Sequence, residues 1–312
     1  MGAREDQHEP VLLDAVLEHL NLSAEGVYVD GTFGRGGHSR AMLERLGPEG
    51  SLVVIDRDPQ AIEVAERLAA EDSRVTVIRG SFGEIGHCLE AHGLSGKVDG
   101  ILVDLGVSSP QLDDAQRGFS FMRDGPLDMR MDPDAGLSAE GWLNTAAESE
   151  MARVIARFGE EPAARRIARA ICKQREQERI SRTRQLAELI ESVIPRRGKG
   201  KHPATRTFQA VRMHINNELG ELQSFLDAVV EVLSVGGRLC VISFHSLEDR
   251  MVKRFLRDHS RVDPALAGLP VVPESAQPDM RLIGKALQAN AAEVEQNPRA
   301  RSAVLRTGER VS

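Results

Sequence analysis

Aromatic residues and cysteines are scarce in this chain, and long apolar runs are absent. Aromatic residues make up 4% of the 312 residues, which argues against an aromatic platform that stacks single-stranded nucleic acid. Cys88, Cys172 and Cys240 are too few and too scattered for a disulfide framework or a zinc cluster, and are predicted to be small core residues. No apolar run approaches the ~20 residues of a membrane span, and the acidic N-terminus lacks the apolar stretch of a secretory signal. The sequence therefore predicts a cytoplasmic protein.

The net charge of −7 is unevenly distributed along the chain. Residues 1–150 hold 12 Lys/Arg and 28 Asp/Glu (net −16), residues 151–215 hold 16 and 6 (net +10), and residues 216–312 hold 12 and 13 (net −1). An acidic total disfavours nucleic acid as a partner, but the middle segment is strongly basic. That segment is either a solvated helical face or a surface for a polyanion, and its charge alone leaves both open.

Both ends of the chain alternate between strand and helix patterns. Short apolar runs predict strands, and the segments between them have helical periodicity. Continuous apolar strands separated by helices are typical of a parallel sheet covered on both faces, so the predicted fold class is α/β. The predicted strands are 26–30, 51–56, 75–78, 100–105, 237–243 and 303–306. The predicted helices are 10–20, 38–46, 59–70 and 247–258.

Strand patterns are missing from the middle of the chain. Residues 112–135 are rich in Asp, Gly, Arg and Met, and predict an ordered loop or short helices, with charges that pair with one another. The simplest organisation is a discontinuous α/β core, 1–110 and 216–312, with a helical and basic domain inserted at 111–215. The helices predicted in and after this insertion are 138–158, 160–178, 182–194 and 204–234.

A Gly-rich turn, in the segment VDGTFGRGGHS, follows the first predicted strand. Glycines let the backbone approach a ligand closely, and the N–H groups that open the next helix are free to bind it. Asp56 ends the second strand, 20 residues after Gly36, where a carboxylate can accept hydrogen bonds from the ribose of a nucleoside cofactor. The turn lacks Gly-x-Gly-x-x-Gly, and Asp30 directly precedes it, which disfavours a pyrophosphate and favours a cationic ligand such as S-adenosylmethionine. A dinucleotide cofactor stays the alternative at this point.

The loop DLGVSSPQ, residues 104–111, leaves the carboxyl end of the fourth strand, the edge at which open α/β sheets bind ligands. A conjugated amine such as cytosine N4 is a weak nucleophile. Two acceptors that hold its hydrogens would aim its lone pair at a methyl group, so catalysis would rest largely on positioning. Asp104 and Ser109 are the catalytic candidates in this loop, and a purely structural turn is the alternative. Phe82, after the third strand, can pack against an adenine or equally well in the core.

Five segments of the chain together have a recognisable pattern: VDGTFGRGGHS, DLGVSSPQ, QLDDAQRGFSFMRDGPLDMRMD, HPATRTFQAVR and ISFHSLEDRMVKRF. They resemble the bacterial family that methylates cytosine N4 in 16S ribosomal RNA, and the similarity extends from HEPVLL to NPRARS, nearly the whole chain. The resemblance implies a Rossmann-like class I methyltransferase sheet of seven strands with an inserted, mainly helical domain. It also implies S-adenosylmethionine as the methyl donor and 16S rRNA of the small ribosomal subunit as the partner.

The resemblance assigns roles to individual residues as well. With an RNA substrate, the basic segment becomes an RNA surface whose Arg and Lys neutralise phosphates. The family has Arg after Gly159-Glu160-Glu161, whereas this chain has Pro162. The implied cofactor contacts are Gly36, Gly37, His38, Asp56, Phe82, Asp104 and Gln111. The predicted RNA contacts are Arg196, Arg197, Lys199, Lys201, Arg206 and Arg212.

Several other residues have plainer interpretations. His245 is predicted to be a hydrogen-bonded structural histidine rather than a catalytic one. Apart from any RNA contact, residues 165–184 are expected to be an ion-paired helical surface, for example Arg175 with Glu178. The nine histidines lack metal-ligand spacing, so no metal site is predicted. The methionines predicted to fill gaps in the core are Met122, Met129 and Met131.

Three functions other than RNA methylation are each disfavoured by a feature of the sequence. The missing Gly-x-Gly-x-x-Gly counts against a nucleotide-binding oxidoreductase. The intact loop from Asp104 to Gln111 counts against a non-catalytic RNA-binding protein, and the basic insertion counts against a methyltransferase of proteins or small molecules. A monomer and a homodimer are both compatible with the sequence.

Overall fold

The computed structural model describes residues 10–194, 202–262, 273 and 277–312. The chain divides into two compact units: one contains the residues up to Gly106 together with Leu219–Ser312, and the other is Val107–Glu218. The second unit includes the predicted insertion, 111–215, and a few residues on each side. That this insertion is a domain with its own role in binding RNA stays a prediction.

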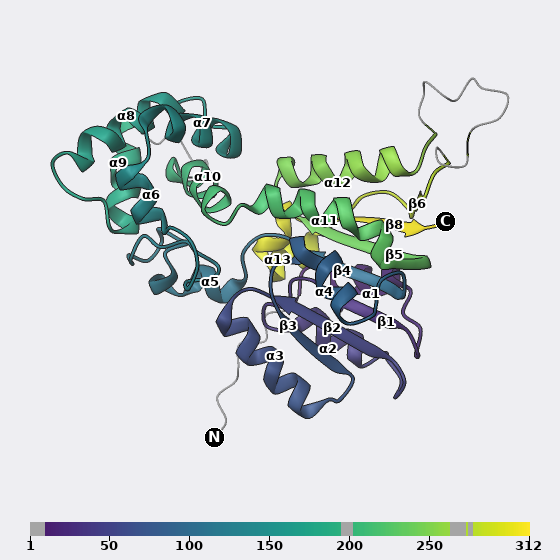
Figure 1. The fold of residues 1–312 in the computed structure, drawn as a ribbon. Coiled ribbons are helices and arrows are strands. Elements are labelled where there is room, and N and C mark those ends of the chain that lie inside the picture. The colour runs from purple at the N-terminus through teal and green to yellow at the C-terminus, as the bar shows by residue number, and fades with distance from the viewer. Residues whose placement is uncertain (1–9, 195–201, 263–272, 274–276) are drawn as a thin grey trace. The chain divides into compact units, whose positions relative to one another are not determined.

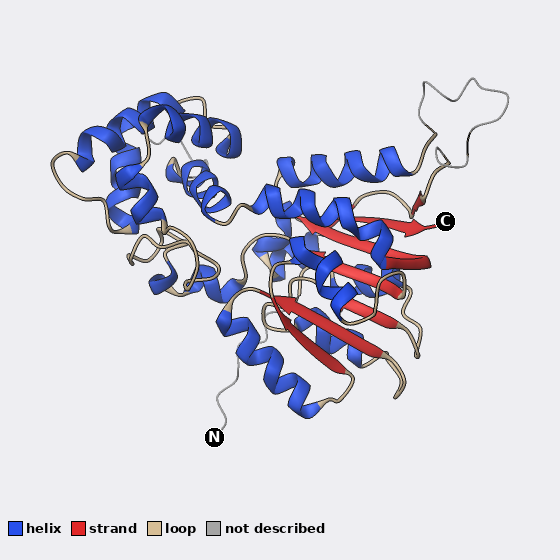
Figure 2. Ribbon diagram, viewed as in Figure 1, coloured by secondary structure: helices blue, strands red, loops and turns tan. Residues whose placement is uncertain are grey.

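The first unit is built around a twisted sheet (Figures 1 and 2). Its strands are β1 (Val27–Asp30), β2 (Ser51–Asp56), β3 (Val75–Arg79), β4 (Val98–Asp104), β5 (Leu233–Ser243), β6 (Met280–Leu282), β7 (Leu287–Gln288) and β8 (Val304–Arg310). Among the described residues the strand order is β3-β2-β1-β4-β5-β8-β6, and β7 pairs with β8. The strands β1 to β5 are parallel, whereas β8 is antiparallel to β5. The predicted α/β, Rossmann-like fold is therefore confirmed.

Helices cover both faces of this sheet because successive strand side chains point to opposite faces and both sets are apolar. On one face, Tyr28 and Leu52 belong to the core that α1, α2 and α3 complete. On the other face, Val29 and Val53 belong to the core that α4, α11 and α12 complete. These helices are α1 (Leu13–Leu20), α2 (Gly37–Leu43), α3 (Pro59–Glu71), α4 (Ile85–Ala91), α11 (Glu218–Val232) and α12 (Ser246–His259).

The predicted strands all form, and most differ by only a few residues from their predicted bounds. The prediction at 303–306 is the first part of the longer strand β8. The sequence missed β6 and β7, which have three and two residues and are too short for a periodic pattern. The expectation of seven strands was wrong: the described residues form eight, because both short strands pair with β8.

The second unit is helical and has its own core. Trp142, Ile155, Ile167, Leu186 and Phe208 are all buried in it. In the described part of this unit no strand forms, and a single bridge joins Pro126 to Arg182. Its helices are α5 (Ser109–Asp113), α6 (Ala139–Thr145), α7 (Glu148–Gly159), α8 (Ala164–Arg175), α9 (Thr183–Val193) and α10 (Ala204–Ile215).

Two of the helices predicted from periodicity are broken in the structure. The prediction at 138–158 corresponds to α6 and α7, which are separated by an extended backbone at Ala146 and Ala147. The prediction at 204–234 corresponds to α10 and α11, which are separated at Asn216 and Asn217. Asn217 has φ 50°, a left-handed conformation that asparagine tolerates better than most residues and that ends α10. The apolar periodicity continues across this break, so the pattern could not reveal it.

Asn216 holds the end of α10 to the loop that precedes α6. Its Oδ1 accepts the N–H of Met131 at 2.7 Å, and its Nδ2 donates to the carbonyl of Met129 at 2.7 Å. The same Nδ2 donates to the carbonyl of Arg212 at 2.9 Å, one turn back in α10. The side chain of Asn216 therefore satisfies three backbone groups in a buried position.

The loop at 112–135 is ordered and charge-paired, as predicted. Arg130 forms a salt bridge with Asp128 at 2.7 Å, and the Nη2 of Arg117 donates to the carbonyls of Arg130 and Met131. Gly118 has φ +72°, and a Cβ there would lie 2.2 Å from the carbonyl oxygen of Pro126, so only glycine fits. Of the methionines predicted to lie in the core, Met129 and Met131 are buried, but Met122 is 79% exposed and that prediction was wrong.

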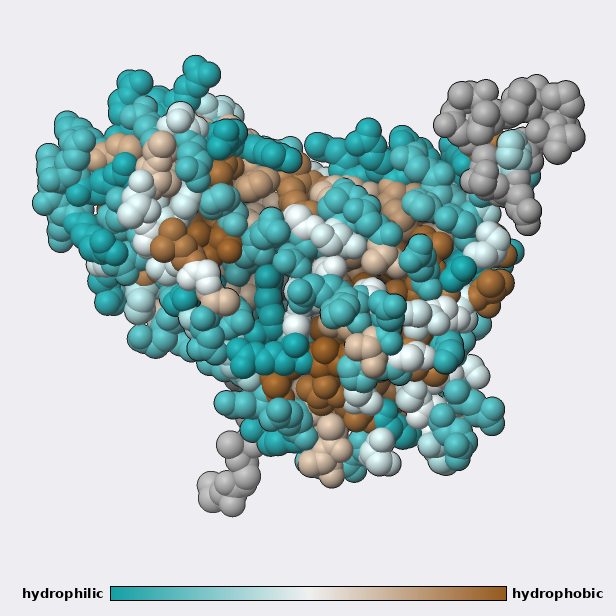
Figure 3. Space-filling view, in the orientation of Figure 1, coloured by the Kyte–Doolittle hydropathy of each residue, from teal (hydrophilic) through white to brown (hydrophobic). Residues whose placement is uncertain are grey.

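The surface drawn in Figure 3 is largely hydrophilic, with apolar side chains in scattered groups. Within the described part of the chain, no helix combines the length and the apolar character that a membrane crossing requires. All three cysteines are free thiols. Cys240 is buried in the core of the first unit, as predicted, and Cys172 is half-buried against the core of the second unit. Cys88 is half-buried.

Replacing Asn216 by Ala is expected to lower the free energy of unfolding by about 2–4 kcal/mol, because the N–H of Met131 and the carbonyl of Met129 lose their buried partner. Urea titration followed by circular dichroism measures the change. Asn217→Gly is the matched control, since glycine adopts the left-handed conformation freely, and it should leave the stability unchanged or slightly raised. Equal stability of Asn216→Ala and Asn217→Gly would contradict the role given to Asn216.

Candidate active site

Acidic side chains gather at the carboxyl ends of the parallel strands. Asp30 ends β1, Asp56 ends β2 and Asp104 ends β4. Parallel strands share one carboxyl edge, and the order β3-β2-β1-β4 changes direction between β1 and β4, where open α/β sheets bind their ligands. The three carboxylates singled out from the sequence thus lie along the edge of the sheet at which this type of fold binds ligands.

The Gly-rich turn is tied to the first two of these carboxylates. Asp56 accepts the N–H of Gly34 at 2.8 Å and the N–H of Asp58 at 2.9 Å, one on each oxygen. Asp30 accepts the N–H of Thr32 at 3.1 Å and the hydroxyl of Ser39 at 2.6 Å. The two aspartates therefore hold the turn against the ends of β1 and β2.

The carboxylate of Asp56 keeps acceptor capacity for a ligand. Each carboxylate oxygen can accept two hydrogen bonds, and the N–H donors of Gly34 and Asp58 use one on each. Burial raises the pKa of Asp56 to about 6, the charges of Asp58 and Asp30 act in the same direction, and the two N–H donors oppose them. At neutral pH Asp56 is mainly ionised, which is the form that accepts hydrogen bonds from ribose hydroxyls.

Two predicted cofactor residues, Gly36 and Gly37, lie where the turn becomes α2. Gly36 has φ +75°, and Gly37 is so close to Pro10 that a Cβ would lie 2.5 Å from its ring. The next residue, His38, turns its ring inward, with Nε2 at 3.0 Å from the carbonyl oxygen of Val11. Burial lowers the pKa of His38 to about 4, so this ring is neutral at pH 7. What His38 offers a ligand at this turn is its backbone N–H rather than its ring.

Asp104 differs from the other two carboxylates because its hydrogen bonds are incomplete. Its Oδ1 is buried and has no hydrogen-bond partner among the described residues. Burial raises the pKa of Asp104 to about 8, and the negative charges of Asp30 and Glu248 add to this effect. Buried polar atoms without a partner are rare in folded proteins, so this oxygen marks a place for a hydrogen-bond donor or a cation from a ligand.

Phe82 opens the short helix η1 (Phe82–Glu84) after β3 and is half-buried. One edge of its ring packs against Phe225 of α11, with the ring centroids 5.7 Å apart. Beside it, the hydroxyl of Ser81 donates to the carboxylate of Glu221, also in α11. The sequence did not predict a role for Glu221. An acidic residue in a helical pattern gives no indication of a hydrogen bond to a residue as distant in the chain as Ser81.

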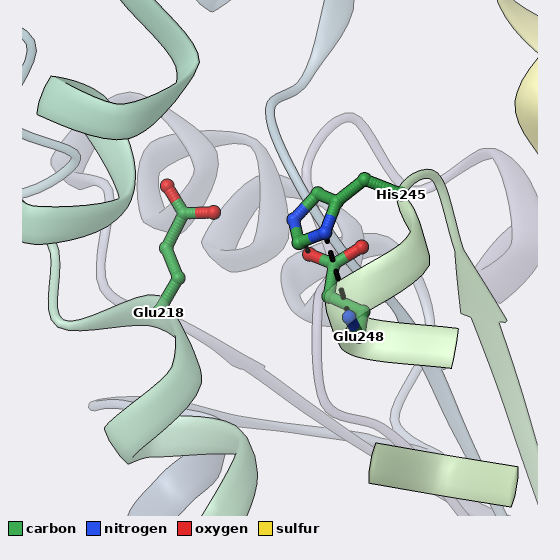
Figure 4. Close-up of side chains that lie close together, drawn as sticks. All are labelled: Glu218, His245 and Glu248. Carbon is green, nitrogen blue, oxygen red and sulfur yellow. Dashed lines mark hydrogen bonds and ion pairs between the residues drawn. The ribbon is translucent and has the colours of Figure 1, made fainter. Parts of the chain in front are cut away.

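His245 caps the start of α12 and pairs with Glu248 (Figure 4). Its Nδ1 accepts the N–H of Glu248 at 3.4 Å, and its Nε2 lies 2.9 Å from Oε1 of the same residue. The other carboxylate oxygen, Oε2, accepts the N–H of Phe244 at 3.1 Å. Nδ1 of His245 is thus hydrogen-bonded, whereas Nε2 is buried and forms no hydrogen bond within the described residues, although it lies close to the Glu248 carboxylate. The structural role of this histidine stays a prediction. Glu248, which the sequence did not single out, is only 2% exposed.

Gln111 and the catalytic candidate Ser109 belong to the unit Val107–Glu218 and lie in α5. Ser108 caps this helix: its hydroxyl accepts the N–H of Gln111 at 3.4 Å, and Oε1 of Gln111 accepts the N–H of Ser108 at 3.0 Å. The reciprocal pair is a capping box, so the side chain of Gln111 has a local structural function besides any contact to a cofactor.

The predicted RNA contacts fall into three groups. Arg196, Arg197, Lys199 and Lys201 lie outside the described residues. Arg206 is 55% exposed, and it donates to the carbonyl of Glu160 and lies 3.8 Å from the carboxylate of Glu161. Arg212 is only 15% exposed and forms two 2.7 Å hydrogen bonds with Glu218. Its charge is compensated inside the protein, which removes the argument for Arg212 as a phosphate contact. Pro162 lies in the turn between α7 and α8.

A sequence model of the MraW methylase family matches residues 5–311. The chain belongs to this family. A curated relative from Alcanivorax borkumensis, named ribosomal RNA small subunit methyltransferase H, is 55% identical over 306 residues, which are 98% of this chain and 97% of the relative. The family and the enzyme class predicted from the sequence are thus confirmed, and the protein is a methyltransferase.

Solved structures that resemble this member of the MraW methylase family are more distant. An rRNA methylase from Streptococcus thermophilus is 12% identical, with 96% of this chain and 94% of that chain covered and a TM-score of 0.38. A SAM-dependent methyltransferase from Aquifex aeolicus is 11% identical, with 97% and 92% covered and a TM-score of 0.42. The assignment to the family rests on the sequence matches and not on these likenesses.

Asp104→Asn is expected to stabilise the unliganded protein at pH 8 but not at pH 5. The pKa of Asp104 is about 8 when folded, against about 4 for an unfolded Asp. Between these values the folded state holds a proton that the unfolded state has lost, so this group lowers stability as the pH rises from 4 to 8. Asn is neutral throughout and removes the effect. Thermal unfolding of both proteins at pH 5 and pH 8 measures it, and a difference that is the same at both pH values would contradict the burial described for Asp104.

Proposed function

We propose that this protein transfers a methyl group from S-adenosylmethionine to the N4 amine of a cytidine in 16S rRNA of the small ribosomal subunit. The structural observation that carries the proposal is the buried oxygen of Asp104 without a partner, at the ligand edge of a methyltransferase sheet. Support for the substrate comes from the relative of 55% identity, whose name is that of a methyltransferase of small-subunit ribosomal RNA.

The carboxyl edge suits a cationic cofactor. Asp30, Asp56 and Asp104 make this edge acidic, and none of them forms an ion pair with Lys or Arg within the described residues. S-adenosylmethionine carries a sulfonium and an amino group, and it supplies a methyl group that a nitrogen lone pair can attack in line. Asp104 ionises more easily beside such a positive charge, because an opposite charge lowers the pKa of a carboxyl group.

Each residue predicted to bind the cofactor has a plausible chemical task. Asp56 accepts the ribose hydroxyls, Phe82 packs on the adenine, and Asp104 contacts the cationic part of the molecule. Gly36 and Gly37, with the N–H of His38, bring the opening turn of α2 close to the cofactor. Gln111 follows Asp104 in the chain and completes the set of residues implied by the family motif.

The acceptor amine needs positioning more than a strong base. The lone pair of cytosine N4 is conjugated with the ring, so acceptors that hold the N4 hydrogens must turn that lone pair toward the methyl carbon. The carboxylate of Asp104 and the hydroxyl of Ser109 are the candidates for this task. In the reaction N4 forms a bond to the methyl carbon and releases one proton. A cytidine in folded RNA has to be turned out of its stack to reach the site.

The proposal places the protein in the cytoplasm, with the small ribosomal subunit as its partner. It is tested by incubating the protein with methyl-labelled S-adenosylmethionine and with small subunits from cells that lack the modification. The expected product is 16S rRNA labelled at N4 of one cytidine, identified by nuclease digestion and mass spectrometry. Asp104→Asn, used in the same assay, should transfer much less label. Label in a ribosomal protein, on another base, or nowhere would reject the proposal.

Asp56→Ala is expected to weaken the affinity for S-adenosylmethionine at least tenfold, because the ribose hydroxyls lose a charged acceptor. Isothermal titration calorimetry measures the dissociation constant. The matched control is Asp72→Ala, which removes a half-buried carboxylate, paired with Arg74, from the other end of the sheet, just before β3. Affinity for the cofactor should stay the same in this control. If Asp56→Ala also binds as tightly as the wild type, Asp56 is not the ribose ligand.

A further inference from the structure

The exposed face of α8 carries four positive charges in a row. Arg165, Arg166, Arg169 and Lys173 are all exposed, and their spacing places them on one side of the helix. The opposite side, with residues such as Ile167 and Ile171, is buried in the core of the second unit. The sequence of α8, ARRIARAICKQR, contains no Asp or Glu. In Figure 3 the side of the second unit that is in view is mostly hydrophilic.

The structure leaves most of these charges without compensation. Arg165 and Lys173 form no ion pair or hydrogen bond through their side chains within the described residues. Arg166 donates to the carbonyl of Val193 at 2.7 Å, which satisfies one N–H group but leaves the charge. Arg169 lies 3.7 Å from Glu148, with the two side chains 77% and 45% exposed. An exposed pair at that distance contributes little.

Beyond Lys173, the arginines between residues 175 and 182 have partners, as the sequence predicted for an ion-paired helical surface. Arg179 pairs with Glu140 and Arg182 with Asp124, at 2.6 and 2.7 Å. Arg175, which the sequence paired with Glu178, donates instead to the carbonyls of Leu143 and Ala146 at the end of α6. Exposed cations without an ion pair within the described residues thus include Arg165 and Lys173 on α8, and also Arg153 and Arg157 on α7. What distinguishes α8 is that its charges lie in one row.

The helix dipole favours Lys173, which lies in the last turn of α8, but it does not favour the other three charges of this face. Arg165 and Arg166 lie in the first turn, which has no acidic residue and where the helix dipole disfavours cations. Arg165, Arg169 and Lys173 also follow one another at four-residue steps, where like charges repel. In α12 both ends suit the dipole: Glu248 and Asp249 lie in the first turn, and Arg257 and His259 in the last. Helix stability explains the charges of α12, but it does not explain Arg165, Arg166 and Arg169 of α8.

We propose that the exposed face of α8, formed by Arg165, Arg166, Arg169 and Lys173, binds the phosphate backbone of the RNA substrate. The inference rests on the proposed function, because that function supplies the polyanion. Four-residue steps on a helix place Arg165, Arg169 and Lys173 about 6 Å apart, so the row can follow a strand over several nucleotides. The face has no aromatic side chain and therefore contacts phosphates rather than bases, which positions the RNA without selecting its sequence.

The test compares two variants that each lose three exposed positive charges. One is R165Q/R169Q/K173Q on α8, in which Gln keeps a good helix propensity. The matched control is R45Q/R67Q/K97Q, whose residues are exposed on the first unit. Binding to protein-free 16S rRNA and to unmodified small subunits is measured at several salt concentrations. The α8 variant should bind roughly tenfold or more weakly, and its slope of log K against log salt should fall by about 2–3, because three phosphate contacts are lost. The control should keep the affinity and slope of the wild type.

Additional measurements separate this inference from the proposed function. In the α8 variant the affinity for S-adenosylmethionine and the rate at saturating subunit should stay unchanged, while KM for the subunit rises. R165K/R169K keeps the charges and should bind nearly as the wild type does. If the triple variant is unstable, R165Q, R169Q and K173Q are tested singly, and each should lower the slope by about 0.7–0.9.

Two results would overturn the role of α8. The first is a wild-type salt slope in the α8 variants. The second is a loss of binding to assembled subunits with no loss on protein-free RNA, which would make a ribosomal protein the partner of this face. In both cases methylation by the wild-type protein would still support the proposed function. A wild-type protein that neither binds nor methylates small-subunit RNA would instead reject the function itself.

Discussion

The burial of three carboxylates at one edge of the sheet is the constraint on which the rest of the candidate site depends. Removing a carboxylate from water is costly unless hydrogen bonds or positive charges replace the lost hydration. Asp30 and Asp56 are stabilised by backbone N–H groups and a hydroxyl, most of them from the Gly-rich turn and the start of α2, so that turn and these acids fix each other's conformation. Burial and the charges of Asp30 and Glu248 raise the pKa of Asp104, and one of its buried oxygens lacks any donor within the described residues. Asp104 has the fewest hydrogen bonds of the three carboxylates, so a cationic ligand would stabilise its ionised form the most.

Opposite charges serve two opposite ligands in this protein. The sheet edge is acidic and suits a cofactor with a sulfonium and an amino group. The outer face of α8 is basic and suits a polyanion. The net charge of −7 averages the two and describes neither, since binding depends on the local field and not on the total. His245 follows β5 at the sheet edge, yet its Nδ1 caps the start of α12 by accepting the N–H of Glu248, so position alone does not make it catalytic.

Much of the fold could be predicted because its determinants are local. The strand that ends at Asp56 and the one that ends at Asp104 are continuous apolar runs, and a parallel sheet with both faces covered requires such runs. The errors occur where a distant contact overrides a local pattern. The apolar periodicity from 204 to 234 continues through Asn216, but hydrogen bonds to Met129 and Met131, more than eighty residues away, end the helix there. β6 and β7 form only because β8 offers its free edge to them.

The sequence by itself determined the α/β class, the Gly-rich turn, the acids at the strand ends and the family, because each is written in adjacent residues or in a fixed motif. Only the tertiary structure decided which charges are available to a ligand. Arg212 and Arg165 look alike in the sequence, yet Glu218 neutralises the first and no described residue neutralises the second. The reason is physical. Whether a charged side chain is compensated depends on which segments, often far apart in the chain, pack against it. Local hydropathy and residue spacing do not predict such long-range contacts.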